Sequence, residues 1–191
     1  GALRDVAAAV ALAPEHLSHY HLTLEPNTLF AAHPPALPDE DSAWDMQEHC
    51  QARLADAGYV QYEISAYAQP GRQCAHNVNY WRFGDYLGIG AGAHGKVSLP
   101  ASDAGRTPEE CSDRVLRRWK HKHPTTYLTR AGTAAAIGAD TIIAPAQLPF
   151  EFMLNALRLR EGFALDHFEA RTGLSQSAID EPLGRAIARG W

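Results

Sequence analysis

The chain has 191 residues, of which 46% are hydrophobic and 20% charged, a composition typical of a soluble globular chain with one domain or parts of two. Its formal net charge of -5 argues against non-specific nucleic-acid binding, and without a run of about 18 apolar residues we expect no stable membrane insertion. Three widely spaced cysteines, Cys50, Cys74 and Cys111, indicate a reducing, cytoplasmic compartment rather than a disulfide framework.

Helical and strand patterns alternate along the first 67 residues. Helical spacing of apolar residues predicts helices over about 3–11 and 41–57, and alternation predicts strands over 17–25 and 60–67. The order helix, strand, helix, strand favours an α/β fold with parallel strands and helices outside them. In such folds ligands bind at the C-terminal ends of the strands. Glu25, Glu63 and Ser65 lie at or near those ends, on the polar strand faces.

The segment HNVNYW, residues 76–81, combines a histidine with two asparagines, a tyrosine and a tryptophan. A plain core does not require this mixture, whereas a site for a flat, partly polar ligand does. Alone, His76 would more often be a structural or loop histidine. Its aromatic neighbours favour a ligand role, because imidazole is a common axial haem ligand and Tyr80 and Trp81 can stack on a porphyrin.

A glycine-rich run follows this segment. Residues 86–93 could form a further strand whose glycines allow close approach of a ligand or another backbone. Residues 90–95 match G-x-G-x-x-G, but the residues after them do not open a helix, so we reject a dinucleotide site. Among His16, His19 and His21, only the last two share a strand face. A polar cavity lining or hydrogen-bonded histidines explain them better than a zinc site.

The rest of the chain suggests a boundary and a small helical module. Residues 100–113 read as a polar loop, and the basic stretch 114–122 reads as a solvated face or a contact for anionic groups such as porphyrin propionates. An Ala-, Gly- and Pro-rich segment, 131–146, indicates a domain boundary. After Pro149, three short helices favour a small, winged-helix-like domain. Its arginines are scattered, so we rank a DNA-binding role low.

Five ordered segments resemble one known family. They are HLSHYHLTLEPNT (16–28), GYVQYEISAYAQPG (58–71), HNVNYW (76–81), GDYLGIGAGAH (84–94) and EFMLNALRLREGF (151–163). Together they are similar to the HemW proteins, radical S-adenosylmethionine (SAM) proteins related to the oxygen-independent coproporphyrinogen III oxidase. The HNxxYW motif is the most discriminating, because it marks the haem-chaperone branch of that family.

The resemblance implies the later part of a partial TIM-type barrel followed by a small helical domain. We expect residues 1–98 to supply late barrel strands and helices, 99–146 a linker region, and 147–191 the truncated C-terminal domain. The family's C-x-x-x-C-x-x-C cluster motif is absent here. A 4Fe-4S cluster and SAM are therefore expected in the full-length protein only, and this chain reads as an internal or C-terminal piece of it.

The resemblance also implies residue roles. His76 matches the motif histidine that would ligate haem iron, and Asn77, Tyr80 and Trp81 would shape the haem pocket. Thr23, Ala93 and His94 match positions that approach SAM in the related oxidase. The expected cofactor-binding set is completed by Glu25, Glu63, Gly90 and Gly92.

Two functions follow from the resemblance. The leading one is a haem chaperone that binds haem and passes it to a haem-requiring client protein. The alternative is coproporphyrinogen III oxidation, the SAM-dependent oxidative decarboxylation of two propionates to vinyl groups, in which Glu25, Glu63 and Tyr62 would line the pocket. This fragment alone is expected to be inactive in that reaction.

Overall fold

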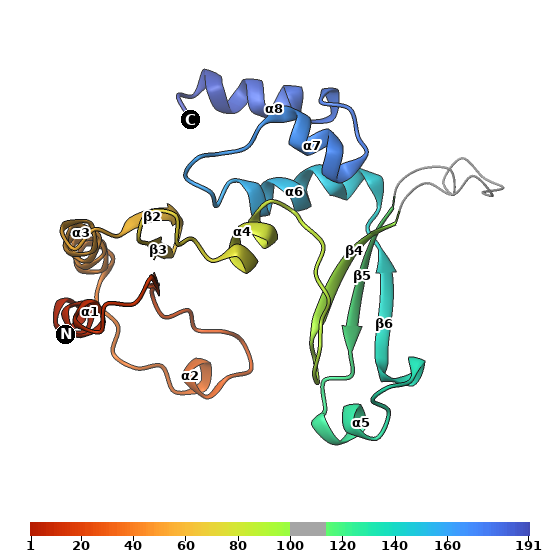
Figure 1. Cartoon of the computed structure of the whole chain (residues 1–191), viewed down its shortest axis with the longest axis horizontal. Helices are drawn as coiled ribbons and strands as arrows, with labels where there is room; N and C mark the ends of the chain where they lie inside the picture. Colours follow the sequence, from red (N-terminus) through yellow and green to blue (C-terminus); the bar gives the residue numbers. More distant parts are fainter. Residues whose placement is uncertain (100–113) are drawn as a thin grey trace. The chain divides into compact units, whose positions relative to one another are not determined.

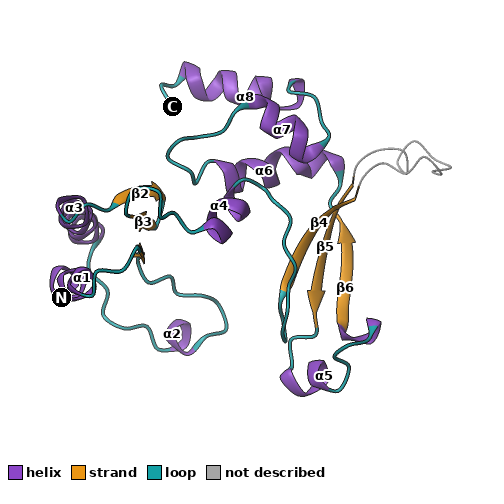
Figure 2. Cartoon of the chain, in the orientation of Figure 1, coloured by secondary structure: helices purple, strands orange, loops and turns teal. Residues whose placement is uncertain are grey.

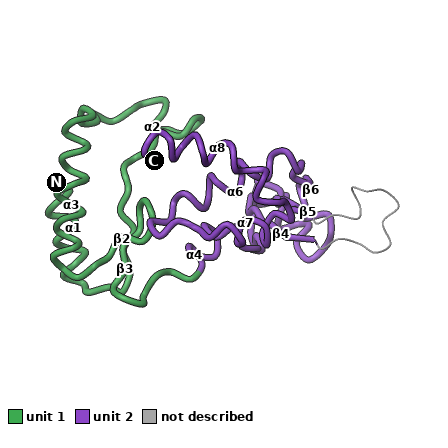
Figure 3. The backbone as a smooth tube through the Cα atoms, turned by 90° about the horizontal axis from the view of Figure 1, so that it is seen from above, with its two compact units in different colours: residues 1–75 green, residues 76–191 purple. Residues whose placement is uncertain are grey.

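The computed structural model describes residues 1–99 and 114–191 (Figure 1). The predicted polar loop at 100–113, with Cys111, lies outside the described residues. By its contacts the chain divides into two compact units, Gly1–Ala75 and His76–Trp191, which Figure 3 colours separately. Each unit is described by itself below.

Two helices of unit 1 pack against each other. They are α1 (Ala2–Ala11) and α3 (Glu40–Asp56), and both confirm the helices predicted at 3–11 and 41–57. Helix α3 begins where the Asp39 carboxylate accepts a hydrogen bond from the Ser42 amide at 2.8 Å, a standard N-cap. It ends before Gly58, whose φ of 85° suits the left-handed residue after a helix. A short helix, α2 (Leu29–Ala32), lies between them in the chain.

The sheet of unit 1 differs from the prediction. Its strands are β1 (His16–Ser18), β2 (Val60–Glu63) and β3 (Ala66–Ala68), ordered β1-β3-β2, and both pairings are antiparallel. The expected parallel arrangement is therefore wrong for the described strands.

Two predicted strands of unit 1 are also shorter than expected. The single strand at 60–67 is a hairpin, because the chain turns at Ile64 and Ser65 and pairs with itself. The strand at 17–25 ends at Ser18, where its ladder with β3 ends. A strand exists only where a neighbour takes its backbone hydrogen bonds, and side-chain alternation cannot show where that neighbour stops.

The core of unit 1 joins the two helices to the hairpin. Its buried members are Val6, Cys50, Leu54, Tyr59 and Tyr67. The Tyr59 hydroxyl donates a 2.6 Å hydrogen bond to the carbonyl of Pro14, which satisfies the polar end of this otherwise buried ring.

Unit 2 is built on a second antiparallel sheet, drawn as arrows in Figure 2. Its strands are β4 (His94–Leu99), β5 (Arg114–Lys120) and β6 (Ile137–Ile142), in that order. Helix α5 (Pro124–Leu128) and a 3-10 turn (Ala134–Ala136) connect β5 to β6 at one end of the sheet (Figure 1). The strand predicted at 86–93 is wrong, because only Tyr86 bridges to β4, opposite Lys96.

The basic stretch predicted as a solvated face forms the central strand, β5. Two of its arginines are paired across the fold: Arg117 with Glu151 at 2.5 Å, and Arg118 with Asp140 at 2.7 Å. Residues 114–142, within the expected linker region, thus form two of the sheet's three strands. The three-part domain division at 98/99 and 146/147 stays a prediction.

Three helices follow the sheet, as predicted. They are α6 (Leu148–Ala156), α7 (Leu165–Thr172) and α8 (Ser177–Ala188), with a 3-10 turn (Pro145–Gln147) before α6. Phe152 is fully buried at their centre, with the rings of Phe83, Phe163 and Phe168 packed against its own at 5.7, 5.0 and 5.2 Å between centroids. Val115 of β5 belongs to the same buried cluster, so sheet and helices share one core. The winged-helix assignment stays a prediction.

Candidate functional site

Helix α4 (Ala75–Trp81) carries the HNVNYW segment. It stops where Phe83 adopts a φ of 54° and the Gly84 amide donates to the Asn79 carbonyl at 2.8 Å. Only glycine fits at 84, since a Cβ there would lie 2.0 Å from Asn79 Oδ1. The Asn79 side-chain amide then donates to the Asp85 carbonyl at 2.9 Å. The second asparagine of the segment therefore has a structural role: it fixes the chain reversal after α4.

His76 lies in the first turn of α4 and is exposed to solvent. In the part of the chain that the structure describes, its imidazole makes no hydrogen bond or ion pair. Tyr80 is four residues further on, so both side chains project from the same face of the helix. An accessible imidazole is a side chain that can ligate haem iron.

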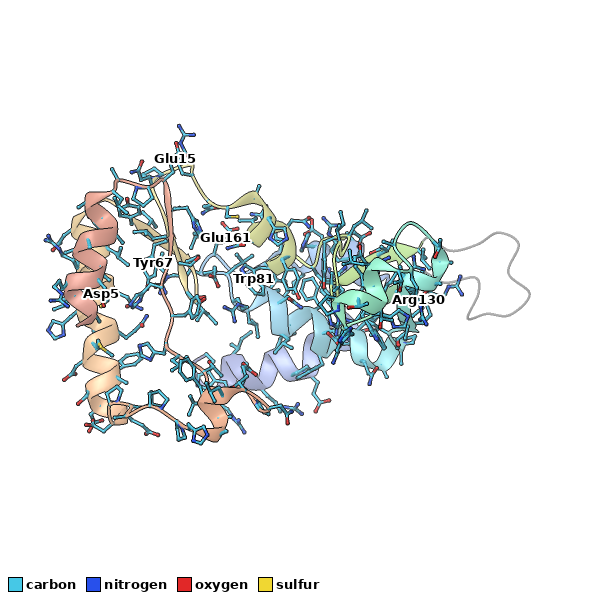
Figure 4. All side chains as sticks on the ribbon, turned by 90° about the horizontal axis from the view of Figure 1, so that it is seen from below. Asp5, Glu15, Tyr67, Trp81, Arg130 and Glu161 are labelled. Carbon is cyan, nitrogen blue, oxygen red and sulfur yellow. The ribbon has the colours of Figure 1, made fainter. Side chains whose placement is uncertain are left out.

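An aromatic cluster holds the other end of α4. Trp81, labelled in Figure 4, meets the ring of Tyr80 edge-on at 5.0 Å between centroids, and the Arg158 guanidinium lies 4.2 Å over the Trp81 ring. Tyr80 also packs on Tyr86 at 4.8 Å, and their hydroxyl oxygens are 3.5 Å apart. Burial and the hydrogen bond with Tyr80 raise the pKa of Tyr86 well above its usual value. The Tyr86 phenol is therefore neutral at physiological pH.

A buried lysine anchors the chain just after the cluster. Lys96 Nζ donates to the Phe83 carbonyl at 2.9 Å, lies 4.1 Å over the Phe83 ring and pairs with Asp85 at 3.2 Å. Burial lowers the pKa of Lys96, while Asp85 opposes that shift. Partial burial works to raise the pKa of Asp85, but hydrogen bonds from Ser98 and Lys96 outweigh it and hold that pKa low. These contacts tie the turn after α4 to β4.

The glycines of the 84–95 run accommodate the protein's own backbone. A Cβ on Gly88 would lie 2.3 Å from the His94 carbonyl oxygen, and one on Gly95 would lie 3.0 Å from the Gly88 nitrogen. The chain therefore folds back on β4 so closely that no side chain fits. The sequence left open whether the glycines make room for a ligand or for another backbone, and at Gly88 and Gly95 it is another backbone. The prediction that no helix opens after residues 90–95, on which the rejection of a dinucleotide site rests, is confirmed, because these residues lead into β4.

The predicted cofactor residues of this run lie together in one loop and the strand after it. The Gly90 amide donates a hydrogen bond to the Tyr127 hydroxyl at 3.2 Å, and the Gly92 amide donates one to the His121 carbonyl at 2.8 Å. Ala93 leads into β4, and His94 opens the strand and stacks on Trp119 at 6.3 Å between centroids. No Cβ at Gly90 would meet an atom within 4 Å, so its surroundings are open.

The remaining predicted residues belong to unit 1. Thr23 and Glu25 lie in irregular chain, and the Glu25 carbonyl accepts a 2.7 Å hydrogen bond from Thr28. Glu63 ends β2, is 2% exposed and accepts a hydrogen bond from the Ser65 hydroxyl at 3.1 Å. The structure therefore buries Glu63 and gives it a hydrogen-bond partner within the hairpin, which the sequence pattern does not reveal.

Unit 1 also contains a largely apolar cavity of about 310 Å³. His19, Tyr20 and His21 line it together with residues of α1 and α3, and burial followed by the charge of His21 lowers the pKa of His19. The third histidine, His16, is hydrogen-bonded to the Tyr62 hydroxyl at 2.9 Å. Cavity lining and hydrogen bonding, the preferred explanation of these histidines, are both confirmed.

Within residues 1–99 and 114–191, no three His, Cys, Asp or Glu side chains are grouped so as to hold a metal ion. Of the cysteines there, Cys50 is fully buried in the core of unit 1 and Cys74 is half-buried. The described helices include none with the length and apolar character needed to cross a membrane.

Three site residues were missed by sequence reasoning: Tyr86, Lys96 and Arg158. The folded chain brings each of them against α4 or the turn that follows it. Arg158 lies 77 residues after Trp81 in the chain, so local sequence spacing cannot reveal that the two side chains stack. The available signals were the positions of Tyr86 inside the fourth segment of the family resemblance and of Arg158 inside the fifth.

Comparisons with known proteins cover the whole chain. The family model described as the HemN C-terminal domain matches residues 143–191. The "Heme chaperone HemW" of Escherichia coli (strain K12) is 46% identical over 190 residues, covering 100% of this chain and 46% of that protein. The protein of the same name from Haemophilus influenzae is 45% identical, with the same two shares.

Two further comparisons are narrower. The mouse "Radical S-adenosyl methionine domain-containing protein 1, mitochondrial" is 47% identical over 100 residues, covering 50% of this chain and 22% of that protein. The structure of coproporphyrinogen III oxidase (HemN) from Escherichia coli, described as a radical SAM enzyme, matches with a TM-score of 0.58 and 16% identity, over 88% of this chain and 39% of that one. At that identity the likeness concerns the fold alone. The chain spans about half the length of the curated relatives it matches, and along its whole length it is similar to the HemW proteins.

Proposed function

We propose that the full-length protein is a haem chaperone that binds haem through His76 and delivers it to a haem-requiring client protein. The observation that carries this proposal is an accessible imidazole on α4, next to Tyr80 and Trp81, within a chain 46% identical to proteins named heme chaperone. Haem is the cargo here, so its release matters as much as its binding.

Each residue of the segment has a proposed task. His76 supplies a nitrogen to the haem iron, and its exposure keeps the ligand exchangeable with a ligand on the client. Tyr80 and Trp81 offer aromatic surface for the porphyrin. Asn77 shapes the polar part of the pocket. An open site on one short helix suits transfer, because a deeply enclosed cargo would have to be unpacked first.

The cofactor assignments concern the full-length protein. We place its 4Fe-4S cluster outside this chain, because the sequence lacks the family's cluster motif and no three metal-ligating side chains are grouped among the described residues. For SAM, the proposed contacts from this chain are Thr23, Glu25, Glu63, Gly90, Gly92, Ala93 and His94. We further propose that residues 1–98 complete a TIM-type barrel, that the C-terminal helices form a winged-helix-like domain, and that the protein acts in the cytoplasm.

A haem titration of the full-length protein tests the proposal. Wild type is expected to give a Soret band that saturates at one haem per chain, and His76→Ala is expected to shift or weaken it. His123→Ala is the matched control, because His123 is another exposed histidine of unit 2 that precedes a short helix. A His76→Ala spectrum identical to wild type would refute the ligand assignment.

The alternative is coproporphyrinogen III oxidation. It is favoured by the match of residues 143–191 to the HemN C-terminal domain and by the fold shared with the HemN oxidase. Anaerobic incubation of the full-length protein with coproporphyrinogen III, SAM and a reductant decides between the two. Protoporphyrinogen formation would favour the enzyme. No turnover, with a saturable Soret band in the titration, supports the chaperone.

A further inference from the structure

We propose that Arg158 is a positioning residue for the haem-binding helix: by stacking on Trp81 it fixes α4 and so aims His76. This inference rests on the proposed role of His76 in haem binding. It also gives a function to the C-terminal helices, which lie within the matched residues 143–191: they would hold α4 in place for haem binding.

Helix α4 cannot hold its shape by itself. It has seven residues, from Ala75 to Trp81, and helices this short are unstable in water without tertiary packing. His76, at its start, is exposed. The described contacts that fix the helix in unit 2 therefore act chiefly on its last turn, through Asn79, Tyr80 and Trp81.

Arg158 provides the contact that comes from the C-terminal helices. It lies in the turn directly after α6, and its guanidinium carbon is 4.2 Å from the centre of the Trp81 ring. Arginine suits this position because its planar guanidinium stacks on an aromatic face, whereas a lysine ammonium is a compact, strongly hydrated charge. The Trp81 indole nitrogen is buried and lacks a hydrogen-bond partner among the described residues, so the ring is held by packing and not by its polar edge.

The turn that carries Arg158 is itself firmly placed. Leu159 is 6% exposed, and Ala156 and Phe152 of α6 are fully buried in the core. Glu151, one residue before Phe152, pairs with Arg117 of β5 at 2.5 Å. A rigid platform thus presents the guanidinium to Trp81. Since Trp81 and His76 are about 7.5 Å apart along one helix, a tilt at Trp81 displaces His76 as well.

The first measurement is amide hydrogen exchange of the haem-free, full-length protein. In Arg158→Gln we expect exchange of the hydrogen-bonded amides of Tyr80 and Trp81 to rise about five- to tenfold, as the loss of one cation–π contact predicts, with α8 unchanged. Arg158→Lys should lie between wild type and Arg158→Gln. Arg185→Gln, which removes an exposed ion pair with Glu181 within α8, should leave α4 unchanged.

Haem titration of the same variants is the second measurement. Arg158→Gln is expected to bind haem about five- to tenfold more weakly and to shift the Soret band, with partial rescue in Arg158→Lys. A residue that only stabilises the fold would lower the melting temperature and leave the band position alone. Unchanged α4 exchange in Arg158→Gln, or an unchanged haem spectrum and affinity, would overturn the inference. If wild type itself gave no saturable band while Arg158→Gln loosened α4, the haem proposal would fail and the positioning of α4 would stand.

Discussion

Gly88→Ala should open the close approach between the glycine-rich loop and β4. The added Cβ would lie 2.3 Å from the His94 carbonyl oxygen and 2.6 Å from its carbon, where 3.0 Å is the practical minimum. Both neighbours are backbone atoms, so no side-chain rotation can relieve the clash. The two chain segments must separate, which breaks the paired hydrogen bonds of 2.9 and 3.0 Å between Tyr86 and Lys96.

The magnitude follows from these two effects. Overpacking costs about 1–3 kcal/mol, and two backbone hydrogen bonds contribute about 1 kcal/mol each, so we expect a loss of roughly 3–5 kcal/mol. Urea unfolding and amide exchange at Tyr86 and Lys96 would measure it. The matched control is Gly184→Ala in α8, where no atom lies within 4 Å of the added Cβ and the helix should gain about 0.5–1 kcal/mol. If Gly88→Ala kept the wild-type urea midpoint and exchange rates, the close approach would not exist as described.

Three further outcomes are expected. Lys96→Met should lower stability by about 2–4 kcal/mol in urea unfolding, because it leaves the Phe83 carbonyl and the Asp85 carboxylate without their buried cation; a loss below 1 kcal/mol would contradict that role. The pKa of Asp85 lies below its unfolded value of 3.8, so its contribution to stability is present above that pH and disappears as the pH falls through the folded pKa. Thermal unfolding of Asp85→Asn should therefore depend less on pH below about 4 than that of wild type. Burial, and then the charge of Asp5, raises the pKa of Cys50, so an alkylating reagent should modify Cys74 before Cys50, and modification of Cys50 as early as that of Cys74 would show that its core opens readily.

The helices were the most predictable part of the fold. In α1 and α3, apolar residues recur at helical spacing and the end signals are local: Asp39 before α3 and Gly58 after it. The three C-terminal helices were predicted for the same reason. What these elements have in common is that the information for each lies within a few residues of its own ends.

The strands were less predictable because their partners lie elsewhere. Residues 60–67 alternate like one strand, yet the chain turns back at Ile64. Residues 114–120 were assigned to a charged surface because Arg117 and Arg118 gave no sign of their distant partners, Glu151 and Asp140. Charge alone could not distinguish an exposed loop from a central strand whose arginines are paired.

The candidate site was predictable only in part, because some of its contacts come from elements distant in the sequence. HNVNYW was recognised because it is contiguous, and α4 does present His76 to solvent. Its supporting contacts from Lys96 and Arg158 come from other elements and could not be read from the segment. The glycines beside it were correctly associated with close approach, but at Gly88 the approaching group is the backbone of His94.

The ladder between β4 and β5 pairs Leu99 directly with Arg114, the two residues that flank 100–113 in the sequence. Chain that leaves and re-enters a sheet at adjacent points can change in length at little cost: each doubling adds only about 0.6 kcal/mol of closure entropy. This position is thus a natural place for inserting a fluorescent or affinity tag. Such an insertion would leave the register from His94 opposite Trp119 onward intact, and with it the strand that supports the α4 site.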